Sequence, residues 1–156
     1  MFYFSICCYF FGAFMINLSK CIRIFCETYK DEIDMQGFRS FPKNSCQGAS
    51  ILLGMMLKEK YPSSQVIYVK GEDTNNYCHY WLEVDGFIFD ITADQFDEVE
   101  LPIYGEISQP LLTKFPILSK TSISKELLIS DVTNETYNQF MKMNLNDYLE
   151  KNCQSI

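Results

Sequence analysis

The stretch Tyr77-Cys-His-Tyr-Trp-Leu-Glu-Val-Asp-Gly-Phe-Ile-Phe-Asp-Ile-Thr92 contains the clearest structural pattern in the chain. It predicts two β-strands on either side of Asp85-Gly86, because an Asp-Gly pair favours the type I′ turn of a two-residue hairpin. With that loop, Val84 pairs with Phe87, and the register of every further pair follows. The sequence therefore predicts an antiparallel hairpin around which the rest of the sheet is built.

Alternation along the two strands gives this hairpin one apolar face and one mixed face. The apolar face carries Tyr80, Leu82, Val84, Phe87, Phe89 and Ile91, and the other carries His79, Trp81, Glu83, Ile88, Asp90 and Thr92. On the mixed face His79 lies diagonal to Asp90, at a Cα separation of about 7–8 Å that the two side chains can bridge. A carboxylate in contact with a histidine fixes its tautomer and stabilises the imidazolium, as a catalytic base requires.

A second pattern lies upstream, where the loop Phe41-Pro-Lys-Asn-Ser ends at Cys46 and helical spacing begins. The apolar face of this predicted helix is formed by Ala49, Leu52, Leu53, Met56 and Leu57. Extending that face back by one turn reaches Cys46, which we therefore expect at the helix N-terminus. Unpaired N–H groups and the helix dipole favour an anion there, and so favour the thiolate. The alternative is a structural cysteine, since free cysteine is among the most buried residue types.

The same kinds of pattern predict the other helices and strands of the chain, beside the helix that begins at Cys46. That helix should end near Lys60, because Pro62 follows. Further helices are expected at 16–29 and 134–151, and strands at 65–70 and within 98–104. Residues 105–119 are predicted to be irregular, and 122–129 to form a strand or a helical turn. In the first helix the charged residues fall mostly opposite the apolar stripe: Lys20, Arg23, Glu27 and Lys30.

Composition restricts the classes of partner and the compartment. The 156 residues are 47% hydrophobic and 21% charged, which is typical of a globular protein, and we treat 19–156 as a single domain. A formal charge of −7 without a basic stripe argues against a nucleic-acid partner. Seven cysteines without paired spacing do not predict a disulfide framework, and they favour a reducing cytoplasm.

Residues 1–18 carry no charged side chain and reach the lower length limit for a membrane span. The first cation, Lys20, follows the apolar run, whereas a secretory signal begins with basic residues. Three interpretations of this segment stay open: a membrane anchor or uncleaved signal, a core helix, or an extension upstream of the functional start. The cytoplasmic assignment therefore depends on this segment, and membrane contact is expected only through it.

Cys46, His79 and Asp90 together have the residue types of a nucleophile, a base and an orienting acid. Each also has a structural interpretation: a surface histidine, a strand-capping aspartate and a buried cysteine. Zinc ligation by Cys46, Cys78, His79 and Asp90 is disfavoured, because Cys78 and His79 are adjacent on a strand and point to opposite faces. We therefore predict no metal and no other cofactor, and assign the three residues as catalytic.

The segments His79-Tyr-Trp-Leu-Glu-Val and Asp90-Ile-Thr92 resemble the H-x-W-x-E-V and D-x-T elements of transglutaminase-like proteins, within the papain-like cysteine hydrolase superfamily. The order of a cysteine on a helix, a histidine on a strand and an aspartate on the next strand also matches. The run 41–96 looks like small bacterial and phage members of that superfamily. The resemblance implies an α+β fold of the papain or transglutaminase type, in which an antiparallel sheet packs against the helix that carries Cys46 at its N-terminus. It also implies catalytic roles for Cys46, His79 and Asp90.

The chain also departs from that family. His79 and Asp90 are closer in sequence than in typical transglutaminases, and no W-G-x-C-W-type sequence surrounds Cys46. Gln36 is a weak candidate for the oxyanion donor, and the backbone N–H of Cys46 with one neighbouring N–H is the alternative. The substrate therefore does not carry over from the resemblance.

We expect thiol-dependent amide chemistry, by hydrolysis, deamidation or acyl transfer, on a peptide, protein or small amide substrate. Trp81 is assigned to substrate binding as a wall of the cleft, with shielding of the His79–Asp90 contact or simple packing as alternatives. The rival function is a catalytically inactive binding module on the same fold.

Overall fold

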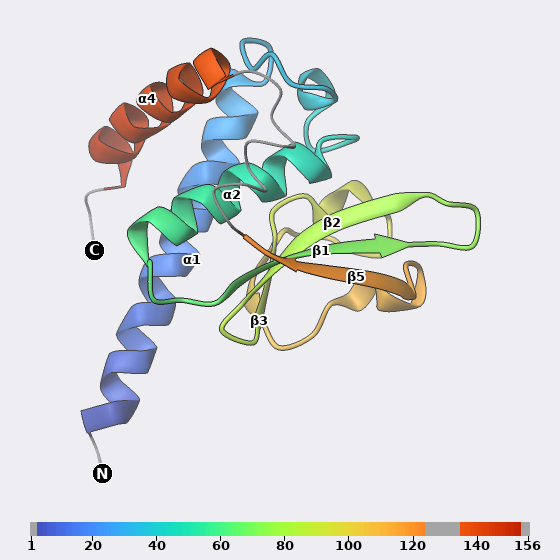
Figure 1. Cartoon of the computed structure of the whole chain (residues 1–156), viewed down its shortest axis with the longest axis horizontal. Helices are drawn as coiled ribbons and strands as arrows, with labels where there is room; N and C mark the ends of the chain where they lie inside the picture. Colours follow the sequence, from blue (N-terminus) through green and yellow to red (C-terminus); the bar gives the residue numbers. More distant parts are fainter. Residues whose placement is uncertain (1–2, 124–134, 154–156) are drawn as a thin grey trace.

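The computed structural model describes residues 3–123 and 135–153. Within them the protein is α+β, with three α-helices and one five-stranded antiparallel sheet (Figure 1). The helices are α1 (Tyr3–Tyr29), α2 (Cys46–Lys60) and α4 (Glu135–Asn152). The strands are β1 (Val66–Glu72), β2 (Cys78–Val84), β3 (Phe87–Asp90), β4 (Ile103–Glu106) and β5 (Ile117–Ser122). Short 3-10 helices are η1 (Phe38–Ser40), η2 (Ala93–Gln95) and η3 (Pro110–Thr113).

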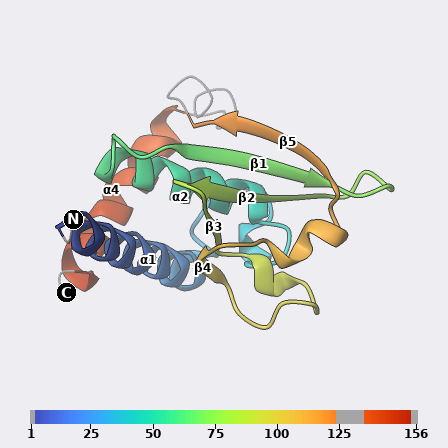
Figure 2. The same ribbon diagram turned by 90° about the horizontal axis from the view of Figure 1, so that it is seen from below.

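The predicted hairpin is present as β2 and β3, and its register is confirmed for the pairs from Val84–Phe87 to Leu82–Phe89. Val84 pairs with Phe87, and Asp85 and Gly86 have φ angles of 51° and 88°, the two positive values that a type I′ turn requires. β3 ends at Asp90, before the predicted end of the strand. The strand order β4-β3-β2-β1-β5 places this hairpin inside the sheet, with β4 beside α1 (Figure 2).

The main core lies between the helices and the apolar face of the hairpin. α2 contacts β1 and β2, while α1 contacts α2, α4 and β4, so the helices gather on one side of the sheet (Figure 1). Buried residues of this core include Ile22, Phe25, Leu53, Leu57, Leu82 and Phe89. Burial of such a set of apolar side chains is the principal stabilising contribution to the fold.

The mixed face of the hairpin is also buried, beneath the chain that follows β3. A second apolar cluster covers it, formed by Val69, Trp81, Ile88, Ala93, Ile103, Leu111 and Phe115. Ala93 comes from η2 and Leu111 from η3, so these short helices close over the face that carries His79 and Asp90. Both polar residues are consequently inside the protein.

The region 1–18 belongs, from Tyr3 onward, to α1, which is much longer than the helix predicted at 16–29. Met15 and Leu18, at the end of this segment, are buried in the main core. The first turns of α1 project beyond the rest of the molecule (Figure 1). No helix in the described part of the chain combines the length and the apolar character that crossing a bilayer requires.

The prediction of irregular structure at 105–119 was wrong at both ends, because β4 continues to Glu106 and β5 begins at Ile117. All six residues of β5 are exposed at the sheet edge, so the strand shows no alternation between buried and exposed positions. Pro110 stands at the start of η3 and Pro116 directly before β5, positions that tolerate a missing N–H. Most of the strand or turn predicted at 122–129 lies outside the described residues.

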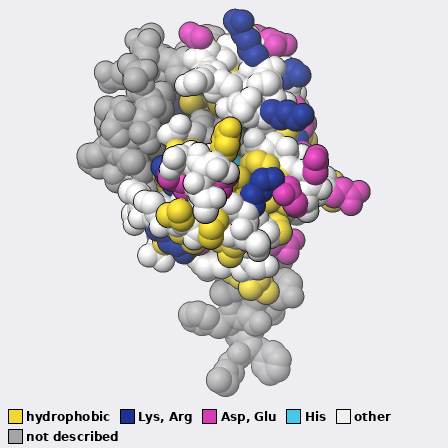
Figure 3. Space-filling view, turned by 90° about the vertical axis from the view of Figure 1, so that its right-hand side faces the viewer, with side chains coloured by type: hydrophobic (Ala, Val, Ile, Leu, Met, Phe, Trp, Pro, Cys, Tyr) yellow, Lys and Arg dark blue, Asp and Glu magenta, His cyan; other side chains and the backbone are white. Residues whose placement is uncertain are grey.

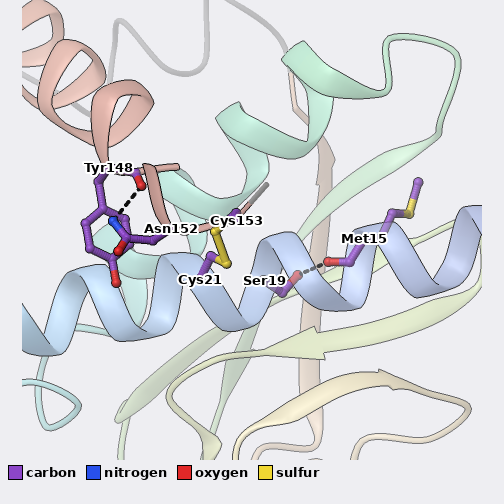
Figure 4. Close-up of a disulfide and its surroundings, with 6 residues drawn as sticks. All are labelled: Met15, Ser19, Cys21, Tyr148, Asn152 and Cys153. Atoms are coloured by element: carbon purple, nitrogen blue, oxygen red, sulfur yellow. Dashed lines mark hydrogen bonds between the residues drawn. A yellow bond between two sulfur atoms is a disulfide. The ribbon is translucent and has the colours of Figure 1, made fainter. Parts of the chain in front are cut away.

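The structure contains a disulfide that cysteine spacing did not predict. Cys21 of α1 is bonded to Cys153, which follows α4, across 132 residues of sequence (Figure 4). Disulfides persist in oxidising environments, so this pair removes the cysteine-based argument for a reducing compartment. Among the cysteines whose side chains the structure describes, Cys26, Cys46 and Cys78 are free.

Candidate active site

Cys46 is the first residue of α2, it is 9% exposed, and it lines a cavity. The preceding residue, Ser45, does not cap the helix with its side chain. Its hydroxyl donates instead to the carbonyl oxygen of Pro42, 2.9 Å away. The backbone N–H groups at the start of α2 therefore receive no acceptor from the Ser45 side chain. This end of a helix is the position at which a thiolate is stabilised.

A hydrogen bond connects the N-terminal end of α2 to the beginning of β2. Ser50, one turn after Cys46, donates from its hydroxyl to the carbonyl oxygen of Tyr80 at 3.0 Å. Tyr80 directly follows His79, so this hydrogen bond sets the position of Cys46 along the strand. The helix and the strand thus hold the thiol and the imidazole next to each other.

His79 and Asp90 form a buried pair on neighbouring strands. The Nε2 atom of His79 lies 2.6 Å from Oδ2 of Asp90, and neither side chain is exposed. The contact expected from the hairpin register is therefore present. Because the carboxylate occupies Nε2, Nδ1 is the ring nitrogen left for the thiol of Cys46.

The carboxylate of Asp90 is held by hydrogen bonds at both oxygens. Oδ1 accepts from the backbone N–H and the hydroxyl of Thr92, at 3.1 and 3.2 Å. Oδ2 accepts from Nε2 of the buried Gln109 at 2.9 Å, in addition to its contact with His79. Gln109 is oriented in turn by the N–H of Leu111, which donates to its Oε1 at 3.2 Å. A buried carboxylate with four partners is satisfied and fixed in orientation.

The pKa of His79 is raised from 6.5 to about 9 by its charged neighbours. Burial alone would lower this pKa, but the charge and hydrogen bond of Asp90, followed by those of Cys46, outweigh it. The imidazole is therefore the imidazolium at neutral pH, between a carboxylate on one side and a sulfur on the other. The structure thus brings together the three residues that the sequence assigned as catalytic.

Aromatic rings surround the imidazole of His79 inside the second cluster. The ring centroids of Phe96, Phe115 and Trp81 lie 4.8, 5.6 and 5.9 Å from that of His79. Trp81 is fully buried and lies outside the cavity lining, so its assignment as a substrate-binding wall of the cleft is corrected. It packs beside His79, which agrees with the alternative that it shields the His79–Asp90 contact from water.

Cys46 lines a cavity of about 1090 Å³, which lies at the end of the molecule that contains the β1–β2 turn. Its walls combine aromatic rings with a few charges, among them Tyr77, Tyr80, Phe96, Asp34, Asp73 and Lys114. Figure 3 views this end of the molecule, where apolar side chains gather among basic and acidic ones. The size and the mixed lining suit a small ligand or a side chain of a larger one.

Arg23 holds the segment after β3 against α1, and its predicted place on the polar side of the helix was wrong. It is 8% exposed, with its guanidinium donating to Asp94 at 2.7 and 2.9 Å and to the carbonyl oxygen of Ile91. The same guanidinium lies 4.8 Å from the ring centroid of Phe41, in the loop before Cys46. One cation therefore joins the two segments that carry the site.

Sequence reasoning missed several residues that complete this arrangement. Gln109 is far from Asp90 in sequence and gives no local pattern. Gln95 lines the cavity near His79 and is equally without one. Thr92 offered a detectable feature, since an aspartate side chain commonly accepts a hydrogen bond from the backbone N–H two residues later.

The four residues considered as zinc ligands, Cys46, Cys78, His79 and Asp90, do not form a metal site in the structure. Within 3–123 and 135–153, no three His, Cys, Asp or Glu side chains are grouped so as to hold a metal ion. The thiol of Cys78 instead lies 3.8 Å from Oε2 of Glu72.

Comparison of the chain with family models, curated proteins and solved structures found no match.

Proposed function

We propose that this protein carries out cysteine-dependent amide chemistry, by hydrolysis, deamidation or acyl transfer. The observation that carries the proposal is the chain of contacts from Cys46 through His79 to Asp90. A thiol at a helix N-terminus faces an imidazolium whose other nitrogen is held by a fully bonded, buried carboxylate. These are the parts of a thiolate–imidazolium nucleophile.

The proposed reaction follows from the positions of the atoms. The thiolate of Cys46 attacks the carbonyl carbon, and the C=O electron pair moves to oxygen. As that pair returns and the C–N bond breaks, the proton on Nδ1 of His79 passes to the leaving nitrogen. Water, or an amine in the case of transfer, then loses a proton to His79 and attacks the thioester, which releases the thiolate.

A papain- or transglutaminase-like arrangement is part of this proposal. The placement of Cys46 at the start of a helix that packs on β1 and β2 supports it, as does the succession of His79 and Asp90 on adjacent strands. We propose a peptide, a protein side chain or a small amide as substrate. The aromatic and polar cavity beside Cys46 and the net charge of −7 support this class over nucleic acid.

The test is the rate of alkylation of Cys46 by iodoacetamide between pH 5 and 9, followed by peptide mapping with Cys21–Cys153 kept oxidised. Cys78 lines the same cavity and serves as the internal reference thiol. We expect rapid labelling of Cys46 at pH 6, reduced about 100-fold in His79→Ala, the lower end of what a positioned base contributes. Labelling of Cys78 should be unchanged by that substitution.

The proposal would be contradicted if the alkylation rate of Cys46 rose with pH as for an ordinary thiol, with a midpoint at about pH 8.5, and were unchanged in His79→Ala. That outcome would favour the inactive binding module on the same scaffold.

A further inference from the structure

We infer that Gln95 is a further catalytic residue, whose side-chain amide donates a hydrogen bond to the substrate carbonyl oxygen and to the oxyanion formed from it. This inference deepens the proposed function and rests on it. The residue comes from η2, after β3, and neither the sequence patterns nor the family resemblance assigned it.

Two hydrogen bonds fix the orientation of the Gln95 amide. Its Oε1 accepts from the backbone N–H of Asn44 at 3.3 Å, and its Nε2 donates to the carbonyl oxygen of Thr92 at 2.9 Å. The oxygen therefore points to the loop before Cys46, and the nitrogen lies 3.5 Å from Nδ1 of His79. Gln95 bridges the segment that carries the thiol and the segment that holds Asp90.

This geometry leaves one amide hydrogen of Gln95 directed at the reacting atoms. A side-chain amide nitrogen has two hydrogens, and Thr92 accepts only one of them. The other faces Nδ1 of His79, which cannot accept it when that nitrogen is protonated. Because the pKa of His79 is raised to about 9, Nδ1 carries its proton at neutral pH. The second hydrogen is then available to an acceptor in the cavity, where both Cys46 and Gln95 are lining residues.

The carbonyl of a bound amide is such an acceptor. When the Cys46 sulfur bonds to the carbonyl carbon, the C=O electron pair moves to oxygen, which then carries a negative charge. A Gln95 N–H on one side and a backbone N–H of the first α2 turn on the other would both donate to it. The pair returns to carbon as the C–N bond breaks and the leaving nitrogen takes the Nδ1 proton. Donors fixed before the reaction are the ones that stabilise such a charge most.

The experiment separates thiol activation from oxyanion binding. Alkylation by iodoacetamide requires the thiolate and His79 but forms no oxyanion, whereas acylation by p-nitrophenyl acetate forms one. The acylation burst is measured in wild type, Gln95→Met and Gln95→Ala, with the signal of Cys46→Ala subtracted. Gln65→Ala, at an exposed glutamine directly before β1, is the matched control, and thermal unfolding checks the fold of each variant.

We expect Gln95→Met to slow acylation about 100-fold, the usual effect of removing one oxyanion donor, while Cys46 alkylation stays within about two-fold of wild type. Gln95→Ala should behave alike, so the result does not depend on one variant folding. Gln65→Ala should change neither rate.

Three outcomes would overturn the inference while leaving the activated thiol in place. They are an unchanged burst in both Gln95 variants, a loss of burst in Gln36→Ala instead, and an activated thiol that gives no burst in wild type. A parallel fall of alkylation and acylation would also overturn it, because Gln95 would then act through His79. If wild-type Cys46 shows neither activated alkylation nor a burst, the proposed function itself fails.

Discussion

Cys26 and Cys46 are both buried and both free, yet their surroundings differ in every other respect. Cys26 lies inside α1 in the main core with no exposed surface, and burial raises its pKa to about 12, against a smaller lowering by the charge of Arg23. Cys46 starts α2, reaches the cavity and interacts with His79. Cys26 is thus closed off from solvent, whereas Cys46 is buried but borders the cavity, begins a helix and has a neighbouring imidazolium.

The comparison has a simple physical basis. Backbone N–H groups within a helix are already bonded to carbonyl oxygens four residues earlier, so they offer nothing to a thiolate at Cys26. The first turn of α2 has N–H groups without such partners, and His79 adds a positive charge. Cysteine is thus a packing residue in α1 and a candidate nucleophile at the start of α2.

The largest expected difference between the two thiols is their rate of alkylation in the native protein at pH 7. Cys46 should be labelled directly, whereas Cys26 should react only through unfolding, which makes it slower by at least about 10³-fold for a protein of ordinary stability. Mass spectrometry of the labelled peptides over time measures both rates in one sample. Comparable rates would mean that α1 opens readily and that burial of Cys26 is not what protects it.

We expect the ionisation of His79 to make the free energy of unfolding depend on pH. Its pKa is raised from 6.5 to about 9 in the folded protein, which corresponds to about 3 kcal/mol at 1.36 kcal/mol per pH unit. Because the folded value is the higher one, this contribution is complete below pH 6.5 and disappears as the pH rises through 9. Urea unfolding of wild type and His79→Gln across this range measures it. A stability difference that grows with pH would contradict the account.

Arg23 is in α1 with Cys26 and also contacts the segments around Cys46 and Asp90. We therefore expect its loss to lower both the free energy of unfolding and the reactivity of Cys46. Arg23→Gln leaves Asp94 without its ion pair and the Ile91 carbonyl without its donor, at an expected cost of about 2 kcal/mol of unfolding free energy. It should also slow Cys46 alkylation, because the segments around Asp90 and Phe41 lose their common attachment. Arg39→Gln, at an exposed position, is the control and should change neither quantity.

The smallest effect is expected for Cys26→Ala. Removing one buried sulfur from the main core should cost about 1 kcal/mol of unfolding free energy, as for other small deletions in a core. Cys46 alkylation should be unchanged, because the two thiols share no partner in the proposed chemistry. A large fall in Cys46 reactivity would show that the regions are coupled more tightly than the structure indicates.

The parts of the fold that local rules control could be predicted from sequence. The Asp85-Gly86 turn fixes the register of the hairpin, and the register places His79 beside Asp90. Periodicity located α2 and its first residue, Cys46. Each of these follows from neighbours in sequence, through turn geometry, alternation or helical spacing.

The parts that depend on distant partners could not be predicted in this way. Helical spacing predicted Arg23 on the polar side of its helix, whereas the structure buries it against Asp94, which lies far along the chain. Gln109 and Gln95 acquire their roles where the segment after β3 folds over the sheet. Cys21 and Cys153 meet only because α4 packs on α1, and β5 was missed because an exposed edge strand has no alternation.

The most direct test of the central claim is the NMR titration of His79, which is the single histidine of the chain and so gives one Hε1 resonance. We predict a pKa of about 9 for His79 in wild type, and a lower value in Asp90→Asn because the neighbouring charge is removed. A wild-type pKa at or below 6.5 that Asp90→Asn leaves unchanged would show that the imidazole is not held between the carboxylate and the thiol.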